Sequence, residues 1–198
     1  MKKLLLSLLL ISPALIYAQQ FTMADIPLKW KHFTIKKGIR HSHVAKISRQ
    51  VLLSYRYKEK NEQGKRPLIV AAELVVDKDK SWIKKEYLDA ADPALKDALL
   101  NHEKGHLAIS LKWHRKLQQT FSDFKFSKRV RIEMDSLYNI VRENADEENE
   151  RYDRETNHML NVDKQAQWEQ KIFTELNDLY ADDKILPMKF EVETVLYE

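Results

Sequence analysis

The chain of 198 residues contains no cysteine, and this absence excludes disulfide bonds. It also excludes a bacterial lipoprotein, which needs a cysteine at its cleavage site. Only three glycines and five prolines are present, and no internal repeat, low-complexity tract or interdomain linker is found. A chain of this length can bury a real core as one domain. We therefore expect a single domain that is held together by its core, which a bound metal could further stabilise.

Long hydrophobic runs are also scarce. The longest, Leu4 to Ile16, is too short for a transmembrane helix, which needs about 20 residues. Lys2 and Lys3 precede it, and Tyr17-Ala18 ends it, which is typical of a cleaved secretory signal peptide. We expect residues 1–18 to be this signal, residues 19–198 to be the mature domain, and the protein to be periplasmic or secreted.

A large excess of charge of one sign is also absent, because 34 lysines and arginines face 30 aspartates and glutamates. Removal of Lys2 and Lys3 lowers the formal net charge from +4 to +2, which is too small to favour binding to nucleic acid or to an anionic membrane surface. We expect no nucleic-acid partner and no integral membrane segment after signal cleavage.

The first part of the mature chain predicts strands, and the part after Asp92 predicts helices. The segment "VLLSYRYK" alternates apolar and polar residues, "LIVAAELVVD" is apolar and β-branched, and the polar link between them predicts a hairpin. Asp92-Pro93 predicts a helix start. We expect helices from there to about Phe121, from about Ser127 into the 150s, and over roughly 163–181, with a last strand in "KFEVETVLY". The fold class is therefore α+β, with a small antiparallel sheet.

The segment "NHEKGH" carries His102 and His106 four residues apart, with Glu103 after the first histidine. On a helix both histidines fall in the apolar stripe, so both rings point into the domain. That spacing lets two imidazoles reach one Zn²⁺, while Glu103 can accept a proton from a zinc-activated water. The alternative is an amphipathic helix with structural histidines.

A catalytic zinc site needs a third protein ligand. His114 lies about 12 Å further along the helix, so we interpret it as a surface or core histidine. We interpret His41 and His43 as structural or exposed. The remaining candidates lie around "ERYDRETNH" and are Glu148, Asp153 and His158.

These motifs resemble a bacterial family of predicted secreted zinc-dependent proteases that is catalogued as a domain of unknown function. The resemblance rests on "HEKGH" after "KSW", on "LKWKHF", and on "YDRETNH" followed by Gln165 and Trp168, and it covers roughly residues 25–170. It implies that His102 and His106 bind zinc and that Glu103 is catalytic. It also implies a site role for the segment that contains Tyr152, Asp153, Thr156 and His158. The family pattern has glycine where this chain has Met159.

Among the candidates for the third ligand we place His158 first, Asp153 second and Glu148 third. Asp153 or Thr156 would then hold the ligand ring by a hydrogen bond. Tyr152 could donate a hydrogen bond to the oxyanion, or be a core tyrosine. The sequence thus predicts a zincin-like zinc metallopeptidase that acts on a peptide or protein substrate. The alternative is a non-catalytic envelope or binding module that is stabilised by zinc.

Overall fold

A computed structural model describes residues 20–62, 64 and 66–196. The expected signal peptide lies outside these residues. Short 3₁₀ turns η1 (Met23–Asp25) and η2 (Trp30–His32) open the described chain. The strands and helices then follow in the order β1 (Thr34–Lys36), β2 (Ala45–Lys46), β3 (Arg49–Tyr57), β4 (Pro67–Val76), β5 (Trp82–Lys84), α1 (Lys85–Ala90), α2 (Pro93–Asp123), α3 (Val130–Thr156), α4 (Val162–Leu179) and β6 (Lys189–Val195). The α+β class is confirmed.

The larger sheet is antiparallel and has the strand order β3-β4-β6. The expected hairpin is confirmed, because β3 pairs with β4 in the register Leu53↔Ala72. The expected last strand is confirmed as well, since Val192 of β6 lies opposite Val70 of β4. The central strand β4 is buried because its residues are largely apolar, and Leu68 and Val70 are inaccessible to solvent. Its inner side chains pack with Leu117 and Phe121 of α2 and with the start of α3.

The smaller sheet was not foreseen. It has the order β1-β5-β2, and β1 runs parallel to β5 while β2 runs antiparallel to it. The expectation of one antiparallel sheet was therefore incomplete. Strands of two or three residues are too short to show a period of two, so no pattern in the sequence indicated them. The short helix α1 follows β5 directly.

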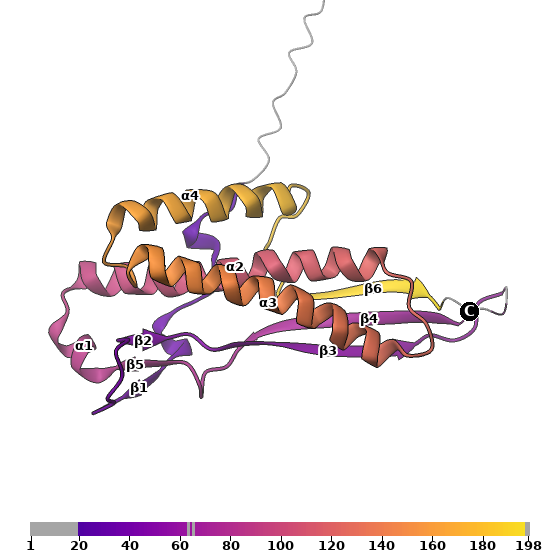
Figure 1. The fold of residues 1–198 in the computed structure, drawn as a ribbon, viewed down its shortest axis with the longest axis horizontal. Helices are drawn as coiled ribbons and strands as arrows, with labels where there is room; N and C mark the ends of the chain where they lie inside the picture. The colour runs from indigo at the N-terminus through magenta and orange to yellow at the C-terminus, as the bar shows by residue number, and fades with distance from the viewer. Residues whose placement is uncertain (1–19, 63, 65, 197–198) are drawn as a thin grey trace, which may run out of the picture.

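Helix α2 runs through the middle of the molecule, with α4 on one side and the strands on the other (Figure 1). The Asp92 side chain caps it by accepting from the Leu95 N–H, and Pro93 takes the first turn, as the sequence predicted. Helix α2 contacts α3, α4, β4 and β6, and for this reason it is buried on several faces around residues 102–109. The candidate motif therefore lies in the most enclosed part of the fold.

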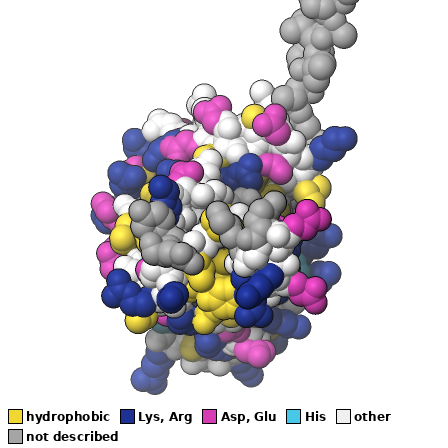
Figure 2. Space-filling model, turned by 90° about the vertical axis from the view of Figure 1, so that its right-hand side faces the viewer, with side chains coloured by type: hydrophobic (Ala, Val, Ile, Leu, Met, Phe, Trp, Pro, Cys, Tyr) yellow, Lys and Arg dark blue, Asp and Glu magenta, His cyan; other side chains and the backbone are white. Residues whose placement is uncertain are grey.

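The smaller sheet and α1 lie at one end of the molecule, and the tip of the β3–β4 hairpin lies at the other (Figure 1). The hairpin end carries cationic and anionic side chains intermixed around a small apolar area (Figure 2). Among the described residues, no helix combines the length and the apolar character needed to cross a bilayer.

Candidate metal centre

The two histidines of the motif lie on one face of α2, as the spacing predicted. His102 is 2% exposed and His106 is 8% exposed, and their ring centroids are 4.9 Å apart. Two adjacent buried imidazoles need polar partners, because an unpaired polar group in the interior is costly. Their partners come from α3 and α4.

Asp153 of α3 lies between the two rings. Its Oδ1 is 3.0 Å from Nε2 of His102 and 2.9 Å from Nε2 of His106. Ligand atoms of these three residues all lie within 4.8 Å of one another, so the group could hold a metal ion. Burial by itself would raise the pKa of Asp153, but the hydrogen bonds with His102 and His106 outweigh burial and keep this pKa below its ordinary value. Asp153 is thus present as a carboxylate.

The opposite nitrogen of each ring faces an amide oxygen. Nδ1 of His102 is 3.2 Å from Oε1 of Gln165, and Nδ1 of His106 is 2.8 Å from Oδ1 of Asn149. The orientation of both amides is fixed by their other bonds, since Nε2 of Gln165 donates to Glu169 and Nδ2 of Asn149 donates to the Ala145 carbonyl. An amide oxygen only accepts, so each Nδ1 carries a proton.

A carboxylate only accepts, so without a cation each Nε2 contacts Asp153 as a proton donor. A cation that replaces these two Nε2 protons leaves neutral rings whose protons are on Nδ1. Lone pairs of three neighbouring ligand atoms then converge on one point, where a cation would satisfy all of them. Two neutral imidazoles and one carboxylate suit a divalent transition metal such as zinc. The residues present therefore fit the metal. Gln165 belonged to the quoted motifs without a role, and nothing in the sequence singled out Asn149.

His158, the first choice from the sequence, contacts the same carboxylate oxygen as the two histidines of α2. Its Nδ1 is 3.3 Å from Oδ1 of Asp153, and its side chain is 47% exposed. Helix α3 ends at Thr156, two residues earlier, and Asn157, His158 and Met159 all adopt positive φ, with Met159 at 78°. That conformation favours glycine, so Met159 has a backbone conformation that residues with a side chain rarely adopt. The structure thus brings Asp153 to both histidines and places His158 next to Asp153.

Glu103 faces the same pocket from α2. It is 4% exposed, and its Oε2 accepts a hydrogen bond of 2.8 Å from the Ile47 N–H. Its Oε1 makes no hydrogen bond with the described residues, so this oxygen is left for a water molecule or a substrate. The sequence placed Glu103 at the edge of the apolar stripe, and the link between β2 and β3 is what covers that edge.

Three other candidate residues, Tyr152, Thr156 and Glu148, make contacts that stabilise the fold. The hydroxyl of Tyr152 is buried, donates to the His102 carbonyl and accepts from Gln165, so Tyr152 is the core tyrosine of the alternative interpretation. The Thr156 hydroxyl donates to the Tyr152 carbonyl within α3 and does not hold a ligand ring. The Glu148 carboxylate accepts from Nζ of Lys112 at 2.6 Å, which supplies the partner that a charge on the apolar stripe requires.

The three metal-binding candidates and Glu103 line one pocket with a volume of about 520 Å³. The segment from His43 to Ile47 forms another wall of this pocket, and the ring centroids of His43 and His158 are 4.3 Å apart. His41 also lines the pocket. His41 is exposed and His43 is half-buried, which agrees with their interpretation as structural or exposed, and their position at the pocket is an addition to it.

His114 is a core histidine, as one of the two interpretations held. It is 3% exposed, and its ring lies 4.7 Å from the ring of Phe190. Burial lowers the pKa of His114 to about 4, and a hydrogen bond with the Ala72 backbone opposes this shift. It does not line the pocket that contains His102 and His106.

A family model described as "Bacterial protein of unknown function (DUF922)" matches residues 36–159. The matched segment contains His102, Glu103, His106, Asp153 and His158 and ends before Gln165. No curated protein and no solved structure matches the chain.

Proposed function

The chain belongs to this bacterial family of unknown function, and we propose that it is an exported zinc metallopeptidase of zincin-like build. The observation that carries the proposal is the convergence of His102, His106 and Asp153 in a pocket that also contains Glu103. A helix with two metal-binding histidines and a glutamate beside a small sheet is the arrangement of a zincin-like site. Export is inferred from the signal-like residues 1–18 alone.

The residues of the pocket can position a metal ion and transfer the protons that peptide hydrolysis requires. When bound, a zinc ion lowers the pKa of a water molecule towards about 7 and polarises a carbonyl. Glu103 would accept the proton of the attacking water with its free Oε1 and pass it to the leaving amine. The Ile47 N–H holds the other oxygen, so the carboxylate keeps its orientation. Gln165 and Asn149 hold the two imidazoles.

A non-catalytic zinc-stabilised envelope or binding module is the second candidate, and His158 is the observation that favours it. Its Nδ1 lies 3.3 Å from Oδ1 of Asp153, close enough to become a fourth ligand after a small movement. Four protein ligands would close the metal, whereas three leave a position for water. X-ray absorption spectra of the zinc-loaded protein distinguish the two coordinations.

The decisive experiment compares metal content and peptide hydrolysis in the unmodified protein, Glu103→Gln and Glu150→Gln. Glu150 is an exposed carboxylate on α3 that lines the same pocket, which makes it the matched control. We expect one zinc per chain in all three proteins, and hydrolysis about 10²–10⁴-fold slower in Glu103→Gln alone. Unchanged hydrolysis in Glu103→Gln would end the proposed mechanism. A chain without metal would end the whole proposal.

A further inference from the structure

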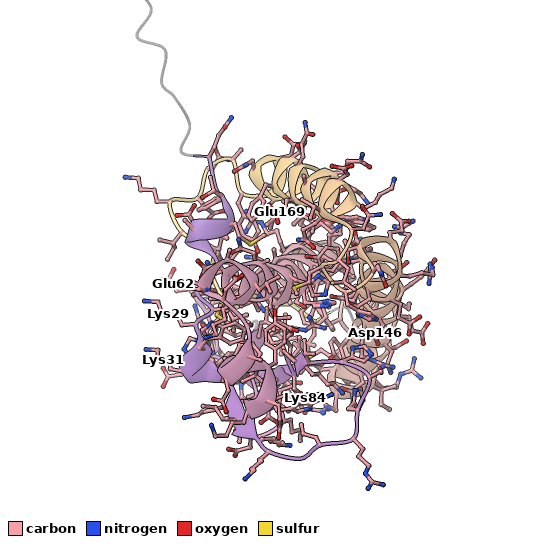
Figure 3. The ribbon with its side chains drawn as sticks, turned by 90° about the vertical axis from the view of Figure 1, so that its left-hand side faces the viewer. Lys29, Lys31, Glu62, Lys84, Asp146 and Glu169 are labelled. Atoms are coloured by element: carbon pink, nitrogen blue, oxygen red, sulfur yellow. The ribbon has the colours of Figure 1, made fainter. Side chains whose placement is uncertain are left out.

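Arg49, the first residue of β3, lies where two cavities meet. It lines the pocket that contains His102, His106 and Asp153, and it also lines a smaller cavity of about 120 Å³ between β3, α2 and α3. Asn149 and Asp146 of α3 line both cavities as well. Figure 3 shows Asp146 on α3, on the opposite side of the molecule from Lys29 and Lys31. The Arg49 side chain therefore belongs to the wall of the candidate active site.

Arg49 is half-buried, and its guanidinium has few hydrogen-bond partners. Its Nη1 donates to Oδ1 of Asn149 at 3.3 Å, and no carboxylate among the described residues forms an ion pair with it. A guanidinium has five N–H donors, so most of them remain for a ligand. Burial lowers the pKa of Arg49, and the nearby carboxylates Glu103, Asp146 and Asp153 oppose this effect. The group stays charged at neutral pH because arginine begins from a pKa above 12.

Other arginines of the described chain have direct partners, and Arg66, for example, donates to the Lys58 carbonyl. Four of them are paired with a carboxylate at 3.3 Å or less, namely Arg56, Arg115, Arg131 and Arg142. The Arg142 pair uses Asp146, the acidic residue that shares both cavities with Arg49. Arg49 has carboxylates nearby, but none among the described residues lies within ion-pair distance, and a charged group that is partly withdrawn from water gains from a ligand that binds it directly.

We propose that Arg49 binds a carboxylate of the peptide substrate and thereby selects peptides that carry one next to the cleaved bond. This inference rests on the proposed function, whose substrate class it names. The planar fork of a guanidinium matches the two oxygens of a carboxylate. Arg49 and His106 share Asn149 as a neighbour, through contacts of 3.3 and 2.8 Å. The carboxylate would therefore lie within about two extended residues of the metal.

Such a carboxylate has two sources, a free C-terminus or an acidic side chain. Four probes separate them. In each probe a succinyl hydroxamate, whose hydroxamate group binds zinc, is joined to one amino-acid residue. The four residues are alanine, alanine amide, aspartate amide and asparagine amide. Preference for alanine over alanine amide identifies a free C-terminus. Preference for aspartate amide over asparagine amide identifies an acidic side chain.

Titration calorimetry on the zinc-loaded full chain would measure the four dissociation constants. We expect one carboxylate probe to bind about 10–100-fold more tightly than its amide partner, the range for a charged hydrogen bond. Arg49→Gln should bring this ratio close to one while the amide probe keeps its affinity, and Arg49→Lys should give an intermediate ratio. Arg131→Gln, the control, removes an exposed pair with Asp135 near the start of α3 and should keep the full ratio.

Equal binding of each carboxylate probe and its amide in the unmodified protein would overturn the proposal, and so would a ratio that survives in Arg49→Gln. The readout needs the metal but no hydrolysis. If the ratio holds while the chain cleaves no peptide, hydrolysis fails and carboxylate recognition stands. If the chain holds no metal and binds none of the four probes, the proposed function and the role of Arg49 both fall.

Discussion

The ring of Tyr152 lies almost parallel to the ring of His102, with centroids 4.7 Å apart and 15° between the planes. Tyr152 can take this position because Gly105 has no side chain. A Cβ at position 105 would lie 2.3 Å from the Tyr152 hydroxyl oxygen and 2.6 Å from Cζ. The glycine inside the histidine motif therefore makes room for the aromatic ring that packs against the first candidate ligand.

Gly105→Ala should destabilise the protein and weaken its metal site. Alanine favours a helix by about 1 kcal/mol relative to glycine, but overpacking a rigid core typically costs about 1–3 kcal/mol. The Tyr152 ring would also have to move against His102. Urea unfolding and zinc affinity measure the two effects, with Gln119→Ala on the exposed side of α2 as the control. An unchanged or higher free energy of unfolding in Gly105→Ala would contradict the close contact.

Asp153→Ala should abolish tight zinc binding, and His158→Ala should retain it. The Asp153 carboxylate contacts both histidine Nε2 atoms, while His158 lies outside the group of three whose ligand atoms converge. Removal of a residue that only hydrogen-bonds a ligand lowers metal affinity by about 10–100-fold. We expect Asp153→Ala to lower the zinc affinity by more than this, because it removes a ligand. Zinc titration against a competing chelator gives the affinities, and Glu150→Ala is the control on α3. Zinc kept by Asp153→Ala and lost by His158→Ala would restore His158 as the third ligand.

The parts of the site that could be predicted are those set by local rules. The Asp92-Pro93 start and the 3.6-residue period fixed α2, so His102, Glu103 and His106 were placed on the correct face. Helix α3 was also expected, and the candidates included Asp153 on it and His158 just after its end. The choice between them depended on how the helix ends. Three consecutive residues with positive φ, none of them glycine, end the helix before His158, and only Asn157 is of a type that tolerates this conformation.

Contacts between distant segments were beyond prediction for a different reason. The charge of Glu148 on the apolar stripe correctly indicated a need for a partner, but the partner is Lys112, which is 2% exposed and belongs to α2. A lysine is rarely buried, so its position in the sequence favoured the surface. The two strands that complete the smaller sheet with β5 have two and three residues, and their pairing depends on the tertiary fold.

Gln165→Ala should weaken zinc binding by about 10–100-fold without removing a ligand. Oε1 of Gln165 accepts from Nδ1 of His102, which fixes the tautomer and the orientation of the ring. Gln170→Ala lies five residues further along α4 at an exposed position and should leave the affinity unchanged. The same chelator competition measures both variants. Equal affinities in the two variants would show that His102 needs no support from α4.

His114 should make the metal-free protein less stable in mild acid. Its pKa is lowered from 6.5 to about 4 by burial, so the folded protein holds it neutral while the unfolded chain takes up a proton first. The stability that this group contributes is therefore complete above pH 6.5 and is lost as the pH falls towards 4. One pKa unit corresponds to about 1.4 kcal/mol, so the loss between pH 7 and pH 4.5 is about 2–3 kcal/mol.

His114→Gln tests this directly, because glutamine keeps a donor for the Ala72 backbone but does not titrate. We expect the free energy of unfolding of the unmodified protein to fall by about 2–3 kcal/mol more than that of His114→Gln between pH 7 and pH 4.5. Urea unfolding in the presence of a chelator gives both curves and removes the proton linkage of metal binding. Parallel curves would mean that His114 reaches water in the folded protein, although its ring is 3% exposed beside Phe190.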